Sequence, residues 1–143
     1  MTGELGFRGY VSSRHFGKER APQHIQNIVI RNYCARKQLQ YLLSATELAM
    51  PDSFMMLEQL VSDIKMVSGL VFYSVEQLPT KIADREKIFC HILNANRSIH
   101  FAVEGLSIYD SKSCRRIENI IEIQAILPAC PDIDELRLAF NEF

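Results

Sequence analysis

The stretch GLVFYSV, residues Gly69–Val75, decides the fold of this 143-residue chain. A continuous apolar run that follows a glycine is typical of a strand covered on both faces, as in a parallel sheet. Weaker strand patterns occur at Leu5–Val11, 39–44 and 98–105, and segments with helical spacing separate all of them. Such alternation predicts parallel strands joined by right-handed crossovers. We therefore expect an α/β fold, a three-layer sandwich with a mainly parallel sheet of about four to five strands.

The segments between the strands have the periodicity of amphipathic helices. Residues 22–38 place apolar side chains three and four positions apart, and Pro22 suits a first helical turn. Residues 53–67 and 83–96 repeat the pattern, with Asp52 or Ser53 as a plausible N-cap for the earlier one. In the first helix, we expect the apolar residues Ile25, Ile28, Val29 and Tyr33 to face the protein core.

The C-terminal part reads as helical. Residues 110–127 favour a helix because Asp110 and Ser111 are good caps, although 117–127 would also suit a strand. A short closing helix is expected at 132–140, after Pro131. We expect one domain, 1–143, with an α/β core at 5–104 and a helical segment at 110–143.

The composition excludes some classes of protein. The chain is 48% hydrophobic with a net charge of −1, so its bulk charge gives no argument for nucleic acid or an anionic membrane as a partner. No apolar run approaches the ~20 residues of a membrane helix. The first residues lack the apolar segment of a signal peptide, and no two cysteines have C-x-x-C spacing. We expect a cytoplasmic protein with free thiols at Cys34, Cys90, Cys114 and Cys130.

Ligands of parallel α/β sheets bind beyond the carboxyl ends of the strands, and the first such loop here is the richest in polar groups. Arg14, His15, Lys18 and Arg20 lie in it, just before a helix begins. They would suit a phosphate or carboxylate, or they are a solvated loop. Neither G-x-x-x-x-G-K-[ST] nor G-x-G-x-x-G occurs, so neither a nucleoside triphosphate nor a dinucleotide is specifically indicated. No cofactor is expected.

Three side chains are candidates for chemistry at this edge: Ser12, His15 and Glu47. His15 follows a strand, whereas the patterns around His24, His91 and His100 indicate structural histidines. No pair of histidines has metal-ligand spacing, and we expect no metal.

Acidic residues follow three of the strands. Glu47, Glu76 and Glu104 would meet at the same edge, where carboxylates act as bases or bind sugar hydroxyls. The alternative is that these acids solvate the rim or cap helices.

Several segments resemble the catalytic domain of serine recombinases, the resolvase/invertase family, over roughly Phe7–Leu127. They are YVSS (Tyr10–Ser13), PQHIQNIVIRNYC (Pro22–Cys34), FMMLEQLVSDI (Phe54–Ile64) and GLVFYSVEQLP (Gly69–Pro79). The resemblance makes Ser12 the counterpart of the nucleophile. Tyr10, Gln77 and Thr80 stand where that family has arginines. Without those cations a scissile phosphate is poorly stabilised, so DNA strand exchange is not expected.

A narrower set of segments looks like the sporadic carbohydrate cluster family, small bacterial proteins encoded among surface-glycan genes. They are RGYVSSR (Arg8–Arg14), YLLSATE (Tyr41–Glu47), IHFA (Ile99–Ala102) and EGLSI (Glu104–Ile108). This resemblance implies a context, cell-surface carbohydrate biosynthesis, without a reaction.

We therefore expect an accessory protein that binds an anionic sugar, a sugar nucleotide or a carbohydrate-pathway enzyme at the carboxyl edge of the sheet. One alternative is a small carbohydrate-modifying enzyme, a transferase, isomerase or hydrolase, that uses the same edge. Another is an interaction module that forms a homodimer through residues 111–127. The expected ligand-binding residues are Ser12, Ser13, Arg14, Arg20, Gln23, Gln26, Glu47, Glu76 and Glu104.

Overall fold

A computed structural model gives the fold and describes residues 5–12, 21–47 and 54–126. The strands are β1 (Phe7–Ser12), β2 (Tyr41–Glu47), β3 (Gly69–Phe72), β4 (Ser98–Phe101) and β5 (Leu106–Ile108). The α-helices are α1 (Gln23–Arg36), α2 (Met55–Ser62), α3 (Ile82–Asn94) and α4 (Ser111–Ile126). Two short 3₁₀ turns are also present, η1 (Ile64–Met66) and η2 (Val75–Gln77).

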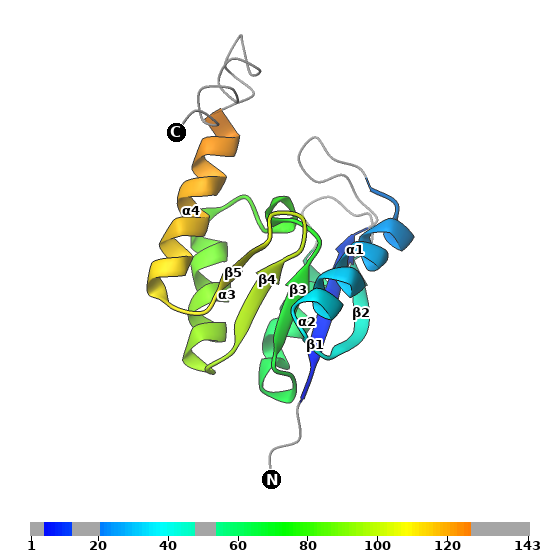
Figure 1. The fold of residues 1–143 in the computed structure, drawn as a ribbon. Coiled ribbons are helices and arrows are strands. Elements are labelled where there is room, and N and C mark those ends of the chain that lie inside the picture. The colour runs from blue at the N-terminus through cyan, green and yellow to red at the C-terminus, as the bar shows by residue number, and fades with distance from the viewer. Residues whose placement is uncertain (1–4, 13–20, 48–53, 127–143) are drawn as a thin grey trace.

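The strands form one sheet in the order β2-β1-β3-β4-β5, in which β1 to β4 are parallel and β5 is antiparallel to β4 (Figure 1). The chain moves from β1 to β2 in one direction and then reverses toward β3 and β4. Right-handed crossovers therefore put α1 on one face and both α2 and α3 on the other. The α/β fold with a mainly parallel sheet of five strands is confirmed.

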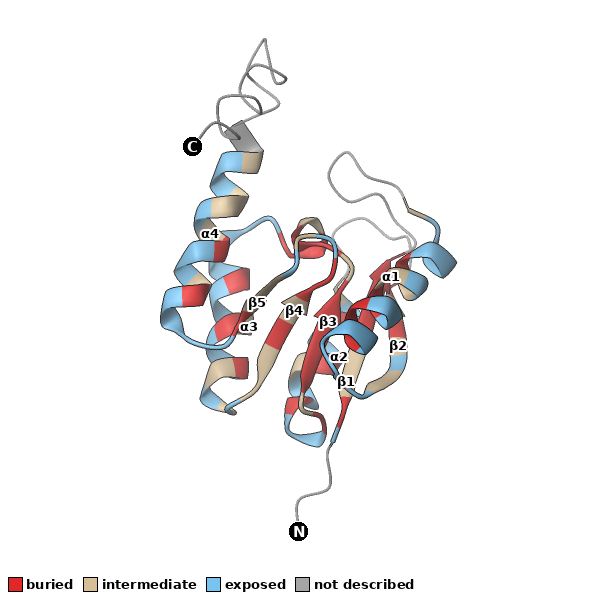
Figure 2. Cartoon of the chain, viewed as in Figure 1, coloured by how far each residue is buried: buried red, intermediate tan, exposed pale blue. Residues whose placement is uncertain are grey.

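Two apolar clusters pack on the two faces of the sheet. The larger cluster joins the sheet to α2, α3 and α4 through side chains such as Phe72, Phe89 and Ile117. The smaller cluster lies under α1 and includes Ile30 and Val71. Figure 2 shows the burial concentrated in the central strands β1 and β3, as expected for strands covered on both faces.

The strand boundaries differ from the sequence prediction in three places. β2 extends to Glu47, so this residue ends the strand instead of following it. β3 ends at Phe72, because Ser74 caps the turn η2. The predicted strand 98–105 stops at Phe101, and the chain reverses through Gly105, whose φ of 66° favours glycine, into the unpredicted strand β5.

The buried face of α1 also differs from the prediction. Gln26, Ile30, Tyr33 and Cys34 are buried, whereas Ile28 is 58% exposed and Ile25 is exposed as well. The buried stripe keeps helical spacing, but its first member is a polar residue. The prediction is confirmed for Tyr33 and wrong for Ile25 and Ile28, while Val29 is partly buried against the smaller cluster.

The predicted C-terminal helix is confirmed as α4, and the strand alternative for 117–127 is wrong over the described residues. Its start is fixed by a reciprocal cap: Ser113 N–H donates to Asp110 Oδ1 at 2.7 Å, and Tyr109 and Asp110 N–H both donate to Ser113 Oγ. The Ser113 N–H bond lowers the pKa of Asp110 below its ordinary value. The expected helix at 132–140 lies outside the described residues.

Arg85 joins α3 to α4. Its side chain is 4% exposed and makes a bidentate pair with Glu118 of α4, with Nε–Oε2 at 2.8 Å and Nη2–Oε1 at 3.0 Å. Its Nη1 donates to the backbone carbonyls of Pro79 and Thr80 at 2.9 and 2.8 Å. One guanidinium therefore joins α3 both to the backbone just before it and to α4, 33 positions further along the chain.

His100 lies in β4 on the face of the sheet that α1 covers. Its Nδ1 is 2.8 Å from Tyr33 Oη, its Nε2 is 3.2 Å from Ser98 Oγ, and its ring meets Phe7 edge to face. Burial, assisted by the charge of Lys37, lowers the pKa of His100 from 6.5 to about 4. The folded chain therefore holds this imidazole neutral.

The chain should lose stability below pH 6.5 because of His100. In the unfolded chain the imidazole takes up a proton near pH 6.5, and in the folded chain only near pH 4, so the stabilisation present above pH 6.5 is lost as the pH falls toward 4. We expect His100→Asn to reduce the loss of unfolding free energy between pH 7 and pH 5 by about 1–2 kcal/mol. Urea unfolding at both pH values measures this.

The exposed His91 of α3 provides the control. His91→Gln should retain the full pH-dependent loss of the wild type. An identical loss in His100→Asn and the wild type would contradict the assignment to His100.

Candidate functional site

The carboxyl ends of β1 to β4 meet at one edge of the sheet, together with the turn η2 (Figure 1). Ser12 ends β1, Glu47 ends β2 and is its cross-strand partner, and Ser74 and Gln77 belong to the turn after β3. Parallel α/β sheets bind ligands at this edge. The hydrogen bonds of these side chains decide what the edge can do.

Gln26 of α1 reaches the end of β1 and is completely buried. Its Oε1 accepts from Ser12 N–H at 2.9 Å and from Gln77 Nε2 at 3.1 Å. Its Nε2 donates to the carbonyls of Ser12 and Ala21, both at 2.8 Å. A primary amide offers two hydrogens and two acceptor directions, and Gln26 uses them all. Its amide therefore pairs with both the N–H and the carbonyl of Ser12, as a neighbouring strand would, and so joins α1 to the last residue of β1.

Gln77 forms the other half of this network. Its Oε1 accepts from the backbone N–H groups of Tyr73 and Ser74, and its Nε2 donates to Gln26 and, at 3.3 Å, to Ser12 Oγ. Ser74 and Gln77 form a capping box around η2. The turn after β3 is thus fixed directly onto the end of β1.

Ser12 is only 1% exposed, and the described side chains that hydrogen-bond to it are the neutral amides of Gln26 and Gln77. Among the described residues, no lysine or arginine hydrogen-bonds to Ser12, Gln26 or Gln77. A serine becomes a strong nucleophile when a base removes its proton or nearby cations stabilise the transition state. Among the described residues, the Ser12 hydroxyl is bonded by the amide of Gln77 and by no ionised group, while Gln26 bonds to the Ser12 backbone.

Glu47 has a structural task at the same edge. It is 1% exposed, its Oε1 accepts from Tyr10 Oη at 2.9 Å, and its carboxylate accepts from the N–H groups of Met56 and Leu57 at 3.1–3.3 Å. The residue before α2, Phe54, provides no side-chain cap. Glu47 therefore caps α2 from a neighbouring strand, where a negative charge is favoured.

Glu104, which follows β4, binds the turn after β3. Its Oε2 accepts from Ser74 Oγ at 2.8 Å, and its Oε1 accepts from Val75 N–H at 3.2 Å. Glu104 and Glu76 are both half-buried, and Gln23, the first residue of α1, is exposed. These three side chains reach solvent, unlike Ser12, Gln26 and Glu47.

The structure thus brings some of the predicted residues together and not others. Ser12 and Gln26 are in direct contact, whereas Glu47 bonds to Tyr10 and α2, and Glu104 bonds to Ser74. The roles of these residues toward a ligand stay predictions. Ser13, Arg14, His15, Lys18 and Arg20 lie outside the described residues. Gln77 was recognised from the sequence only as standing in place of a recombinase arginine and was not among the predicted ligand-binding residues, although its S-x-x-Q spacing with Ser74 is a capping-box signal.

Other kinds of site find little support in the described part of the chain. No three His, Cys, Asp or Glu side chains there are grouped to hold a metal ion. Cys34, Cys90 and Cys114 are unpaired, while Cys130 lies outside this part, and burial raises the pKa of the Cys34 thiol. No described helix is both long and apolar enough to cross a bilayer. Ile123 of α4 is exposed, and a homodimer through 111–127 stays a prediction.

The fold defined by these elements is that of recombinase catalytic domains. One solved structure with this fold is a resolvase family site-specific recombinase from Streptococcus pneumoniae, with a TM-score of 0.62 over 95% of this chain and 94% of that one, at 11% identity. Another is the N-terminal catalytic domain of TP901-1 integrase, with a TM-score of 0.57 over 83% and 95%, at 10% identity. At such identities the likeness shows the fold alone. No family model and no curated protein matches the sequence.

Proposed function

We propose that this chain is an accessory protein of bacterial cell-surface carbohydrate biosynthesis. In this proposal it binds an anionic sugar or sugar nucleotide at the carboxyl edge of the sheet. The carbohydrate context rests on the sequence resemblance to the sporadic carbohydrate cluster family. The observation that supports binding instead of DNA strand exchange is the neutral network of Ser12, Gln26 and Gln77.

The network argues against phosphodiester cleavage because of what it places around Ser12. A DNA phosphate in a transition state needs cationic donors, and Gln77 stands where the sequence resemblance to recombinases calls for an arginine. A glutamine amide gives a weaker, uncharged hydrogen bond. Ser12 is also held against Gln77 Nε2 at 3.3 Å, and its backbone is fixed by Gln26. These contacts hold Ser12 in a fixed position, which suits a structural role at the edge of a binding site.

The proposed roles follow from exposure. Ser12, Gln26 and Glu47 are buried and would hold the edge in shape. The exposed Gln23 and the half-buried Glu76 and Glu104 would meet hydroxyl groups of a sugar. Arg14 and Arg20, which follow β1 in the sequence, would bind the anionic group through charge-assisted hydrogen bonds.

A thermal-shift screen against CMP- and UDP-linked sugars tests the proposal. A ligand present at a hundredfold excess over its Kd adds about 2.7 kcal/mol to the free energy of unfolding. For a chain of this size we expect the Tm to rise by about 5–10 °C. The double variant Arg14→Ala/Arg20→Ala should lose most of this rise, because it removes both proposed donors to the anion.

The matched control removes two exposed arginines elsewhere, Arg115→Ala/Arg116→Ala on α4. It should respond to the sugar nucleotide as the wild type does. The proposal is wrong if no sugar nucleotide shifts the wild type, or if both double variants respond equally. CMP and UDP alone serve as further ligands, and an equal shift with them would assign the site to the nucleotide and not to the sugar.

A further inference from the structure

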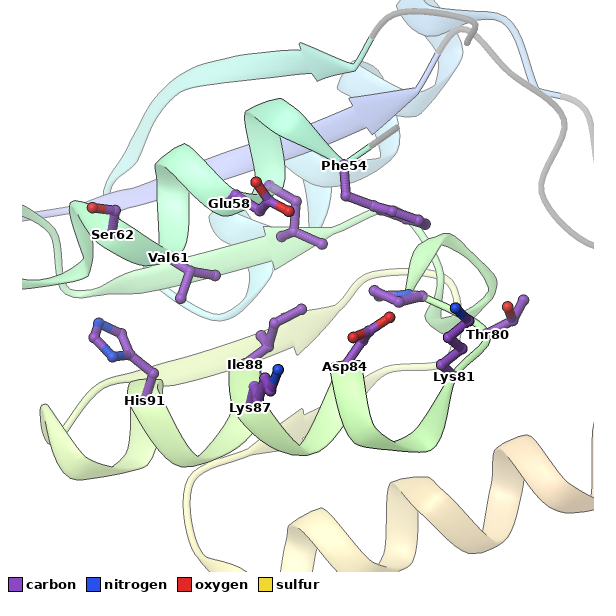
Figure 3. A pocket seen from close by; sticks show the side chains of 12 residues that line it. Phe54, Glu58, Val61, Ser62, Thr80, Lys81, Asp84, Lys87, Ile88 and His91 are labelled. Carbon is purple, nitrogen blue, oxygen red and sulfur yellow. The ribbon is translucent and has the colours of Figure 1, made fainter. Parts of the chain in front are cut away.

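A groove runs between α2 and α3, on the face of the sheet opposite α1 (Figure 3). Its volume is about 680 Å³, within the range of sites that bind ligands or side chains of a partner. It is separate from the network around Ser12, and it reaches from Thr80 and Lys81 at one end to Ser62 and His91 at the other. Its length along α3 is about 15 Å, from the helical rise between Lys81 and His91.

The floor of this groove is apolar. Leu57 lines it and is fully buried. Phe54, Val61 and Ile88 are half-buried side chains that line it from both sides. Met55, Glu58 and Ser62 follow one another at i, i+3 and i+7 and therefore share one face of α2. Since Glu58 and Ser62 line the groove, Met55 lies at its outer rim. Met55 is 69% exposed. An apolar groove of this kind, with polar residues along its rim, suits the apolar face of an amphipathic helix.

The two walls of the groove differ in charge. The α2 wall carries Glu58, whereas the α3 wall carries Lys81 and Lys87 with the single acid Asp84. Neither Glu58 nor the two lysines and Asp84 form a salt bridge with another described residue. An occupant that complements these charges is acidic toward α3 and basic toward α2.

We propose that this groove binds an amphipathic helix of a partner protein. The helix has about three turns, an apolar stripe facing Val61 and Ile88, and acidic residues along the flank that faces Lys87. Two neighbouring helices that present their side chains at helical spacing form a trough into which a third helix packs. The proposal concerns a different surface from the sugar site, and it stands or falls independently of that site.

Two synthetic peptides of fourteen residues test the proposal. Both carry the same leucine stripe at helical spacing, with glutamates along one flank in the first peptide and lysines along that flank in the second. We expect the acidic-flank peptide to shift the amide NMR signals of Val61, Ile88 and His91 in the ¹⁵N-labelled full chain. Lys87→Glu should weaken this binding about 5–10-fold and strengthen binding of the basic-flank peptide.

The control is Lys65→Glu, which reverses an exposed lysine that does not line the groove. It should bind both peptides as the wild type does. The proposal is wrong if neither peptide shifts the groove signals, or if Lys87→Glu binds both peptides with the same affinity as Lys65→Glu. It is also wrong if nuclear Overhauser contacts in the free chain place residues 133–143 against Val61 and Ile88. The last result would assign the groove to the chain's own C-terminal segment.

Discussion

Replacing Arg85 by alanine is expected to lower the free energy of unfolding by about 3–5 kcal/mol. The substitution removes both bonds to Glu118 and leaves that carboxylate, 22% exposed, beside an empty site. It also deprives the carbonyls of Pro79 and Thr80 of the donor that Arg85 supplies. A chain of this size has about 5–15 kcal/mol of stability in total, so the variant should be close to unfolding at 37 °C.

Urea unfolding with circular dichroism measures the effect, and Arg115→Ala, an exposed arginine on α4, is the control. Arg115→Ala should change stability by less than about 0.5 kcal/mol. The double variant Arg85→Met/Glu118→Leu should recover much of the loss, because an apolar pair of similar size carries no unpaired buried charge. A loss in Arg85→Ala no greater than in Arg115→Ala would refute the role given to this pair.

Gln26→Glu should cost at least about 3 kcal/mol at pH 7, although the two side chains have the same shape. The change replaces the amide hydrogens that bond to the carbonyls of Ser12 and Ala21 with an oxygen, and it buries a charge. Burial would raise the pKa of this new carboxyl above the unfolded value near 4.3. The penalty therefore grows as the pH rises above about 4.3, and it is smaller at pH 5 than at pH 7.

Unfolding free energies of the wild type and the variant at pH 5 and pH 7 give the two penalties. Gln23→Glu, at the exposed start of the same helix, is the matched control and should be neutral or slightly stabilising, because an acid in a first turn is favoured. Equal stabilities of Gln26→Glu and Gln23→Glu would show that the buried amide network contributes little.

The fold was readable from the sequence because buried parallel strands are apolar on both faces and their crossover helices are amphipathic. The run at Gly69–Phe72 is such a strand, with every residue buried. The last strand, β5, was missed because it has only three residues and pairs antiparallel after a tight reversal. A strand of three residues is too short for a propensity pattern to predict.

The candidate site was less readable because its contacts are tertiary. Gln26 belongs to the buried stripe of α1, but a pattern that counts apolar residues skips it. Glu47 was expected at a strand end with helix capping as one alternative, and capping of α2 is what its hydrogen bonds show. The pair of Arg85 and Glu118 joins residues 33 positions apart, and nothing local in either segment indicates it.

The strand order has a consequence for the synthesis of the chain. β1 lies between β2 and β3, so one side of β1 has no partner until the ribosome has extended the chain from Ser12 to Gly69. At roughly 5–20 residues per second, this takes on the order of 3–10 s. During that time the backbone of β1 and its apolar residues Tyr10 and Val11 are open to pairing with other nascent chains. We therefore expect chaperones to be needed mainly while the first half of the chain is synthesised, before β3 pairs with β1.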